Sequence, residues 1–271
     1  MERGDWVARY LRRIGFEGEP KPDEATLARL HRAHMLSVPF ENLNIPLGFP
    51  VETTLETLFD KVVVGRRGGF CYELNHLFGH LLKTLGFKVD LLSAGVWSQG
   101  RFGPPFDHLL LAVHLADQRF IADVGFGDSF REPFPILGEA RDSLGVAYRV
   151  NRRGETLVLQ QQKPDAPWVD QYRFTLEPQT IDAFQPMCRY HQSSPESSFT
   201  RRCICTMATA DGRTTLANGR LIRTTAGTRT ETPIVSEADF RAVLAEHFCV
   251  ELPAEVSLTP LRSINEPSPK A

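Results

Sequence analysis

The sequence predicts an α+β protein in which a helical bundle comes first, antiparallel strands follow, and a strand meander with one more helix ends the chain. Apolar residues recur at helical spacing through the first 86 residues. Short β-like runs then follow one another without helices between them, which is typical of an antiparallel sheet or barrel. Two hairpin signals, Asp211-Gly212 and Asn218-Gly219, mark the meander. These observations divide the chain into segments 1–86, 87–190 and 191–271.

Cap and turn residues delimit the helices of the first segment. Asp5 can cap a first helix that ends at Gly15, and Asp23 can cap a second helix. Thr53 or Thr54 can cap a short third helix. Together with the helix described next, these elements predict a small helical bundle.

A glycine-rich loop leads into the last helix of this segment, and Cys71 lies at the junction. The run Gly65-Arg66-Arg67-Gly68-Gly69-Phe70 precedes it, and apolar residues at helical spacing follow it as far as Gly86. Unpaired N–H groups and the helix dipole favour an anion in a first helical turn, and a thiolate is an anion. Free cysteines are more often small buried hydrophobes, so a structural role for Cys71 is the alternative.

The predicted strands of the middle segment are residues 88–97, 108–115, 119–124, 155–162 and 168–176. A short polar turn near Asp117 joins the second and third of these runs, which predicts an antiparallel hairpin. In the last segment, strands within 203–225 precede Ser236-Glu-Ala-Asp239, a capping-box pattern that starts a helix.

Composition and charge exclude several classes of protein. The net charge of −2 gives no field that would draw the whole chain to nucleic acid or to a membrane, and no apolar run is long enough to span one. The N-terminus lacks the basic-then-apolar form of a signal peptide. Five cysteines, an odd number, do not indicate a disulfide framework. We therefore expect a cytoplasmic protein with reduced thiols, and no oligomeric state is predicted.

Two polar residues at strand ends are candidate partners for Cys71. His108 opens an apolar strand, and Asp123 closes the next one. A buried carboxylate is costly without a partner, and a hairpin brings both residues to the same end of adjacent strands. A cysteine nucleophile needs a base and a group that orients that base. The helical histidines are instead expected to be packing or surface residues: His31, His34, His76 and His80.

These residues resemble the motifs of the arylamine N-acetyltransferases. Arg67-Gly68-Gly69-Phe70-Cys71 at a helix start, His108 on a strand and Asp123-Val124-Gly125-Phe126-Gly127 match that family in order and separation. Pro39-Phe40-Glu41-Asn42-Leu43 is similar to its N-terminal region. The match is looser from Cys188 to Phe199, where His191 stands in place of the expected Asn. The resemblance implies an N-terminal helical bundle, a central β-barrel-like domain and a C-terminal α/β lid around a Cys-His-Asp core like that of the cysteine proteases.

The resemblance also implies a reaction and a set of site residues. The reaction would be ping-pong N-acetylation of arylamines or arylhydrazines, with acetyl-CoA as donor and an acetyl-cysteine intermediate. Cys71 would be the nucleophile, His108 the base and Asp123 the orienting acid. Gly125 and Gly127 would let the backbone approach the coenzyme A donor. The candidate lining of an aromatic acceptor pocket is Phe40, Val96, Phe126 and Phe199.

Other interpretations stay open at the level of sequence. A papain-like or transglutaminase-like acyl transferase or peptidase would use the same triad, and a non-catalytic binding module would keep Cys71 as inert core. No metal site is expected, because one residue separates Cys203 from Cys205, whereas zinc motifs use about two to four. Residues 200–230 hold one acid, Asp211, and several arginines that either bind CoA phosphates or form a solvated face: Arg201, Arg202, Arg213, Arg220, Arg223 and Arg229.

Overall fold

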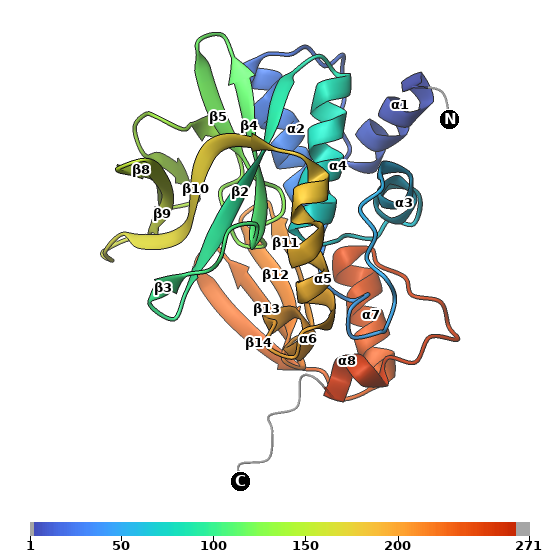
Figure 1. Cartoon of the computed structure of the whole chain (residues 1–271). Coiled ribbons are helices and arrows are strands. Elements are labelled where there is room, and N and C mark those ends of the chain that lie inside the picture. The colour runs from blue at the N-terminus through green and yellow to red at the C-terminus, as the bar shows by residue number, and fades with distance from the viewer. Residues whose placement is uncertain (1–2, 264–271) are drawn as a thin grey trace.

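The N-terminal part of the protein is helical. The structure, a computed structural model, describes residues 3–263. Figure 1 shows α4 between α1 and the strands β2 and β4. No helix within the described residues has the length and apolar character of a membrane span. The elements of this part are α1 (Arg3–Arg13), α2 (Glu24–Ser37), β1 (Phe40–Glu41), α3 (Leu55–Phe59), a π-helical turn (Asp60–Val64) and α4 (Cys71–Thr84).

Local sequence explains where most of these helices begin and end. The side chains of Asp23 and Thr54 accept backbone N–H groups at the starts of α2 and α3, as predicted. Gly86 follows α4 at φ +94°, in the left-handed region that favours glycine. The prediction that Asp5 caps the first helix is wrong, because α1 begins at Arg3 and Asp5 lies inside its first turn.

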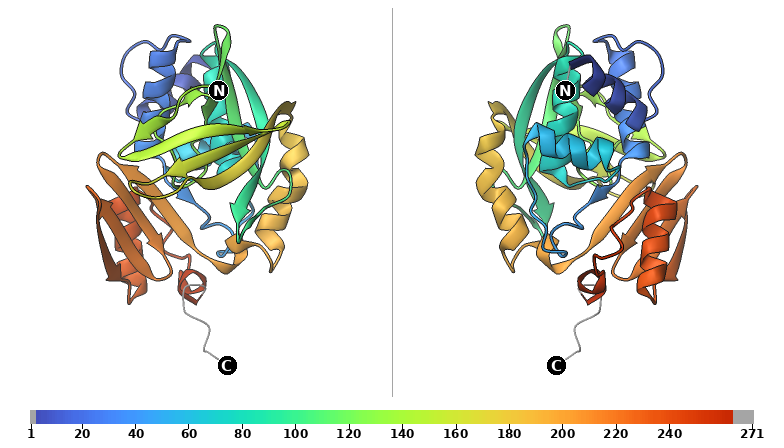
Figure 2. Two further views of the ribbon diagram at one scale, coloured as in Figure 1. Left: turned by 90° about the vertical axis from the view of Figure 1, so that its left-hand side faces the viewer. Right: turned by 90° about the vertical axis from the view of Figure 1, so that its right-hand side faces the viewer.

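A large antiparallel sheet fills the middle of the chain. Within residues 3–263 its strands run in the order β6-β5-β4-β2-β10-β9-β8-β7, with β3 paired to β2. The sheet curls on itself (Figure 2), as the barrel-like prediction requires. All the predicted strands are present, whereas β3, β6, β7 and β8 were not predicted. The bounds are β2 (Lys88–Ser98), β3 (Arg101–Phe102), β4 (His108–Leu115), β5 (Gln118–Ala122), β6 (Phe134–Pro135), β7 (Arg141–Ser143), β8 (Val146–Arg153), β9 (Thr156–Gln162) and β10 (Val169–Gln179).

Strand β4 is buried on both faces, which explains its uninterrupted apolar sequence. Successive side chains of a strand point to opposite faces of the sheet. Leu109, Leu111 and Val113 belong to the core that the strand shares with the helices. Leu110 and Ala112 belong to a second core, built from the other face of the sheet. Helix α4, which begins with Cys71, therefore rests on the strand that begins with His108.

The chain ends in a second sheet backed by helices. Within the described residues this sheet runs in the order β1-β11-β12-β13-β14, so β1 joins it from the N-terminal part. Apolar side chains of the sheet and of the helices form a third core, as a meander followed by a helix predicts. The bounds are β11 (Ile204–Thr209), β12 (Gly212–Ala217), β13 (Arg220–Thr225), β14 (Thr228–Pro233), α7 (Glu237–Phe248) and α8 (Thr259–Ser263).

One of the two predicted hairpin turns is displaced by one residue. Asn218-Gly219 has positive φ at both positions, as the sequence signal predicts. The other turn comprises Ala210-Asp211, because Gly212 is already the first residue of β12. A Cβ at Gly212 would overlap the Thr224 carbonyl oxygen of the neighbouring strand. The glycine is therefore needed for close packing within the sheet rather than for the turn.

Two short helices that were not predicted connect the sheets. After β10 a 3₁₀ turn (Ile181–Phe184) leads into α5 (Gln185–Ser193) and then α6 (Ser198–Arg201). Gln192 ties α5 to the segment before α3, because its side chain accepts the Val51 N–H at 3.0 Å and donates to the Val51 carbonyl at 3.2 Å. The division of the chain at residues 86 and 190 stays a prediction.

Candidate active site

Cys71 is the first residue of α4 and is 3% exposed, so the prediction that it occupies the first helical turn is confirmed. The loop before it is closely packed. A Cβ at Gly68 would overlap the Pro39 carbonyl oxygen, and a Cβ at Gly69 would lie 2.6 Å from the Glu73 carboxylate. Neighbouring atoms therefore leave no space for a side chain at either position, so both residues must be glycine for the loop to pack this way.

Burial dominates the electrostatics of the Cys71 thiol. It raises the pKa of Cys71 well above its ordinary value, and the negative charge of Asp123 adds to this shift. A hydrogen bond from the Leu109 backbone opposes the shift. The start of α4 alone therefore does not make the thiol a thiolate, and deprotonation needs a base close by.

His108 and Asp123 lie just beyond the ladder that pairs β4 with β5. The last paired residues of that ladder are Leu111 and Ala122. Beyond them, Nε2 of His108 lies 2.8 Å from Oδ2 of Asp123. Both side chains are buried, so the contact is shielded from water. The prediction that the hairpin brings the two residues to the same end of adjacent strands is confirmed.

Four groups donate hydrogen bonds to the Asp123 carboxylate. The Tyr172 hydroxyl lies 2.9 Å from Oδ2, the atom that also contacts His108. The Asn75 side-chain amide and the Gly125 backbone N–H donate to Oδ1 at 2.9 and 3.0 Å. Burial alone would raise the pKa of Asp123, but the charge and hydrogen bond of His108 and the bonds from Asn75 and Gly125 hold it below its ordinary value. Asp123 is therefore an ionised carboxylate.

His31 supports Asp123 through the backbone. Its Nε2 accepts the Asp123 N–H at 3.0 Å, and its Nδ1 donates to the Arg131 carbonyl at 2.8 Å. Burial lowers the pKa of His31, which agrees with a neutral ring that accepts a hydrogen bond. His31 is fully buried and stacks on Phe130, so its prediction as a packing residue is confirmed. Its link to Asp123 had no signal in the sequence.

Asn75 and Gly125 join helix α4 to the end of β5. Asn75 donates to the Leu109 carbonyl at 2.6 Å and accepts the Val124 N–H at 2.9 Å. A Cβ at Gly125 would lie 2.8 Å from Cα of Cys71 and 2.7 Å from the Asn75 amide nitrogen. Nothing in the sequence marked Asn75, except its position one helical turn after Cys71.

Cys71 and His108 line one cavity of about 680 Å³. Asp123 lies behind His108, outside the lining, and Gly127 is likewise not part of it. Residues that were not expected at the site also line the cavity, among them Trp97, Asp107, Met187, Tyr190, His191 and Glu196. The other residues predicted for the site all do so: Phe40, Val96, Gly125, Phe126 and Phe199.

Aromatic rings form much of the cavity wall. The Phe126 ring centroid is 5.1 Å from that of His108. Phe199 lies edge-on to Phe70 at 5.5 Å and tilted to Phe40 at 6.2 Å. Aromatic pairs generally prefer such edge-on or offset arrangements, and pockets for small molecules are lined mainly by apolar and aromatic side chains.

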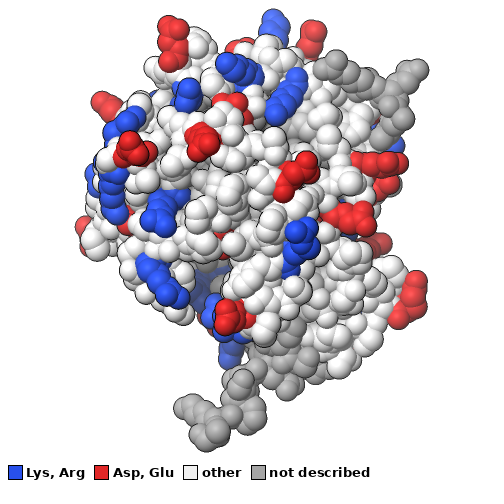
Figure 3. Space-filling model, viewed as in Figure 1, with Lys and Arg blue, Asp and Glu red and all other residues white. Residues whose placement is uncertain are grey.

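Basic side chains gather beside this cavity. Figure 3 shows Lys and Arg around a hollow on the lower part of the molecule, between the regions of β3 and α6. Arg101 and Arg201 belong to the lining. Arg213 instead pairs with Asp128 at 3.0 Å, and other arginines of residues 200–230 pair with Glu231. Of the arginines in residues 200–230, Arg201 thus lines the cavity, whereas Arg213, Arg220 and Arg229 form ion pairs outside it.

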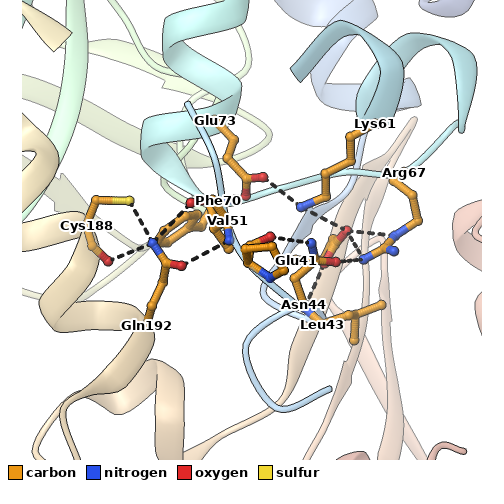
Figure 4. A network of polar contacts seen from close by, with 11 residues as sticks. Glu41, Leu43, Asn44, Val51, Lys61, Arg67, Phe70, Glu73, Cys188 and Gln192 are labelled. Atoms are coloured by element: carbon orange, nitrogen blue, oxygen red, sulfur yellow. Dashed lines mark hydrogen bonds and ion pairs between the residues drawn. The ribbon is translucent and has the colours of Figure 1, made fainter. Parts of the chain in front are cut away.

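A network of buried charges lies behind the loop that carries Cys71 (Figure 4). Glu73 accepts the Phe70 N–H at 3.0 Å and the Lys61 ammonium at 2.7 Å. Glu41 accepts Arg67 at 2.8 Å and lies 3.9 Å from Lys61. Burial raises the pKa of Glu73. At Glu41 the charges of Arg67 and Lys61 outweigh burial and lower the pKa. Arg67 and Lys61 therefore hold the loop in place.

No metal-binding cluster of three or more His, Cys, Asp or Glu side chains occurs within the part of the chain that the structure describes. Cys203 and Cys205 are buried in the core of the C-terminal sheet instead.

Known proteins share this sequence and this fold. The N-acetyltransferase family model matches residues 23–256. The arylamine N-acetyltransferase of Mycolicibacterium smegmatis is 35% identical over 90% of this chain and 91% of that protein. The arylamine N-acetyltransferase of Gallus gallus called pineal gland isozyme NAT-3 is 35% identical over 79% of this chain and 82% of that protein. The structure of Mycobacterium marinum arylamine N-acetyltransferase in complex with CoA is 27% identical, covers 96% of this chain and 98% of that one, and superimposes with a TM-score of 0.87. The chain belongs to the arylamine N-acetyltransferase family.

Proposed function

We propose that this protein transfers the acetyl group of acetyl-CoA to arylamines and arylhydrazines through an acetyl-Cys71 intermediate. The observation that carries the proposal is the meeting of Cys71 and the His108–Asp123 pair at one aromatic-lined cavity. Family membership supports the same reaction, since related proteins are arylamine N-acetyltransferases and one of them was solved with CoA.

The first half-reaction loads Cys71. His108 takes the thiol proton, the sulfur bonds to the acetyl carbon of acetyl-CoA, and the bond from that carbon to the CoA sulfur breaks. The proton on His108 then leaves with the CoA sulfur. Because one thioester replaces another, this exchange is nearly balanced in free energy, which is a chemical reason for cysteine rather than serine.

The second half-reaction forms the amide. The acceptor nitrogen bonds to the acetyl carbon, the bond from that carbon to Sγ of Cys71 breaks, and the released amine proton passes through His108 to the sulfur. The thiol is thereby restored. Conversion of a thioester into an amide runs downhill, so the second step draws the sequence forward.

Asp123 selects the atom of His108 that acts as base. The contact with Asp123 uses Nε2 of His108, so the proton of the neutral ring lies there and the lone pair lies on Nδ1. The ionised carboxylate also stabilises the imidazolium that forms when the thiol is deprotonated. In this assignment Cys71, His108 and Asp123 are nucleophile, base and orienting acid.

The cavity offers an apolar slot for the acceptor. Phe40, Val96, Phe126 and Phe199 line it, and aromatic walls of this kind suit an arylamine ring. Gly125 lines the same cavity, and as a glycine it lets the donor approach the backbone there. Gly127 lies outside the lining, and we assign it a place beside the pantetheine arm of CoA.

We assign the cytoplasm as the compartment of this reaction. All five cysteines are free thiols, and the nucleophile must be reduced to act. The partners in this proposal are small molecules, the arylamine or arylhydrazine and coenzyme A, and neither a nucleic acid nor a membrane is required.

The decisive experiment omits the acceptor. The protein is incubated with acetyl-CoA alone, and its intact mass and peptide map are measured. We expect one acetyl group on Cys71. Cys249, the exposed thiol, provides the control, since Cys249→Ser should leave the adduct unchanged and Cys71→Ala should abolish it.

Acetylation of Cys249 but not of Cys71 would contradict the proposal. Absence of any adduct together with hydrolysis of peptide amides would favour a papain-like or transglutaminase-like enzyme. A Cys71 inert to both acetyl-CoA and alkylating reagents would indicate a binding module.

A further inference from the structure

A chain of polar contacts crosses the cavity wall away from Asp123. The Phe199 backbone N–H donates to the Ser197 hydroxyl oxygen at 3.2 Å, and that oxygen lies 3.0 Å from Nδ1 of His191. Nε2 of His191 lies 3.1 Å from Oδ1 of Asp107. The other oxygen of Asp107 accepts the Val96 N–H at 3.2 Å. The chain therefore joins Phe199 and Val96, two walls of the acceptor slot.

The direction of each contact follows from the donors present. The Ser197 oxygen already accepts a backbone N–H, so its own proton is available to Nδ1 of His191. An imidazole that accepts at Nδ1 carries an N–H at Nε2, and here Nε2 faces the Asp107 carboxylate. That N–H is close to the oxygen but does not meet it at hydrogen-bonding geometry. The His191–Asp107 contact is therefore the weakest in the chain.

The His191 ring also supports Phe199 directly. The two rings meet edge to face, with centroids 5.2 Å apart and planes at 89°. His191 is 6% exposed, and its other face lies against Tyr72 at 6.1 Å. Phe199 itself belongs to α6, a helix of four residues, which is too short to be rigid alone. The Phe199 carbonyl accepts the Asn42 amide at 2.9 Å and its ring meets Phe70 edge-on, so His191 adds one further support to the ring.

We infer that His191, held by Asp107 and Ser197, is a positioning residue that sets the width of the acceptor slot and selects single-ring arylamines over fused-ring arylamines. The inference rests on the proposed function and names a specificity element within its site. With the chain intact, Phe199 stays fixed relative to Val96 and the slot accepts one flat ring. Without His191, the Phe199 ring loses the support on its His191 side, although Asn42 and Phe70 still hold it, and the slot widens towards that side.

The test separates the two half-reactions. The His191→Ala variant is compared with the native enzyme in kcat/KM for a single-ring amine, such as a substituted aniline, and for a two-ring naphthylamine. We expect the ratio of the two values to fall about tenfold, corresponding to the loss of one or two hydrogen bonds of ordinary strength. The change should lie in KM for the acceptor, while acetyl-Cys71 formation from acetyl-CoA alone stays within about twofold.

Graded variants report which contact matters. His191→Asn keeps an amide near the Nδ1 position and can still meet Ser197, whereas His191→Gln places an amide near Nε2 and can still meet Asp107. Because the Asp107 contact is the weaker one, His191→Asn should restore more of the selectivity. The control is His114→Ala, which removes a His–Asp pair of the same chemistry, 2.6 Å from Asp90, at the other end of β4.

An unchanged ratio in His191→Ala, with Cys71 still acetylated, would overturn the inference. An equal loss for both amines would overturn it as well, because slot width must discriminate between them. If His191→Ala does not fold, Ser197→Ala decides the question, since it breaks the same chain with a smaller change in volume. Failure of the native enzyme to form acetyl-Cys71 would instead count against the proposed function.

Discussion

Removing the charge of Glu73 is expected to destabilise the loop that presents Cys71. In Figure 4, Glu73 bridges the Phe70 N–H and the Lys61 ammonium. Glu73→Gln keeps the shape of the side chain and an oxygen for the Phe70 N–H, but it leaves Lys61 without its close partner. The nearest remaining carboxylate, Glu41, is 3.9 Å from Lys61 and already holds Arg67 at 2.8 Å.

The size of the effect follows from burial. The Lys61 and Glu73 side chains are 12% and 2% exposed, so water does not replace the lost partner. Breaking a buried ion pair by removing one partner costs about 3–5 kcal/mol. We take the lower value of about 3 kcal/mol, because Glu41 remains within reach of the ammonium. For a chain of this length that corresponds to a decrease in Tm of roughly 6–12 °C.

The assay is urea unfolding followed by circular dichroism, with the rate of Cys71 alkylation as a local readout. The double variant Lys61→Met with Glu73→Gln should recover most of the loss, because no unpaired ammonium stays buried. Glu237→Gln is the matched control. Its pairing with Arg241 spans one turn at the start of α7 and is partly exposed, so its loss should cost about 0.5 kcal/mol. A similarly small effect of Glu73→Gln, or additive losses in the double variant, would refute the reasoning.

Three further outcomes are expected. Tyr172→Phe removes a hydrogen-bond donor to Asp123 and should slow acetylation of Cys71 by about tenfold without changing the acetylated product. Rapid-quench mass spectrometry measures this rate. An unchanged rate would show that the Tyr172 ring only packs. Gly125→Ala places a Cβ 2.8 Å from Cα of Cys71 and should destabilise the fold by about 1–3 kcal/mol and impair acetylation, whereas native stability and rate would show that the turn can shift. Burial lowers the pKa of His76 to about 4, below the unfolded value of about 6.5, so its contribution to stability is present above pH 6.5 and is lost as pH falls towards 4. His76→Gln should therefore flatten the pH dependence of the free energy of unfolding in that window by up to about 1.4 kcal/mol per pH unit, and an identical slope in urea titrations would contradict this.

Local signals predicted the elements that local chemistry determines. Asp23 caps α2, and Ser236 forms the predicted capping box with Asp239 at α7. Strands β4 and β5 were evident from apolar runs around a polar turn. In each case the decisive contacts lie within a few residues, so the sequence contains them directly.

Elements that depend on tertiary packing were not predicted. Helix α5 is short, and its sequence gives it few apolar residues at helical spacing; Gln192 holds it against Val51, which is distant in sequence. The displaced turn at Ala210-Asp211 has the same origin, because Gly212 is fixed by the neighbouring strand. A glycine signals conformational freedom or close approach, and sequence alone does not distinguish the two.

The same distinction between local and tertiary contacts applies to the residues of the candidate site. His108 and Asp123 could be placed together because a single hairpin relates them. Tyr172 reaches Asp123 from β10, which pairs with β2, which in turn pairs with β4. Its position therefore depends on two registers, and one of them shifts between Phe174 and Pro178. This shift moves the pairing by two residues, so it keeps the faces of the strand, and an irregularity of this kind leaves no clear mark in sequence.

These unforeseen contacts decide what Asp123 can do. Each oxygen of a carboxylate accepts about two hydrogen bonds. Here Oδ2 has His108 and Tyr172, while Oδ1 has Asn75 and Gly125, so both oxygens are saturated. A proton arriving at Asp123 would have to displace one of these donors, and the pKa of the group is held low. Asp123 is thus suited to orient His108 and to stabilise a positive charge on it, so in the proposed reaction the proton from Cys71 would stay on the imidazole.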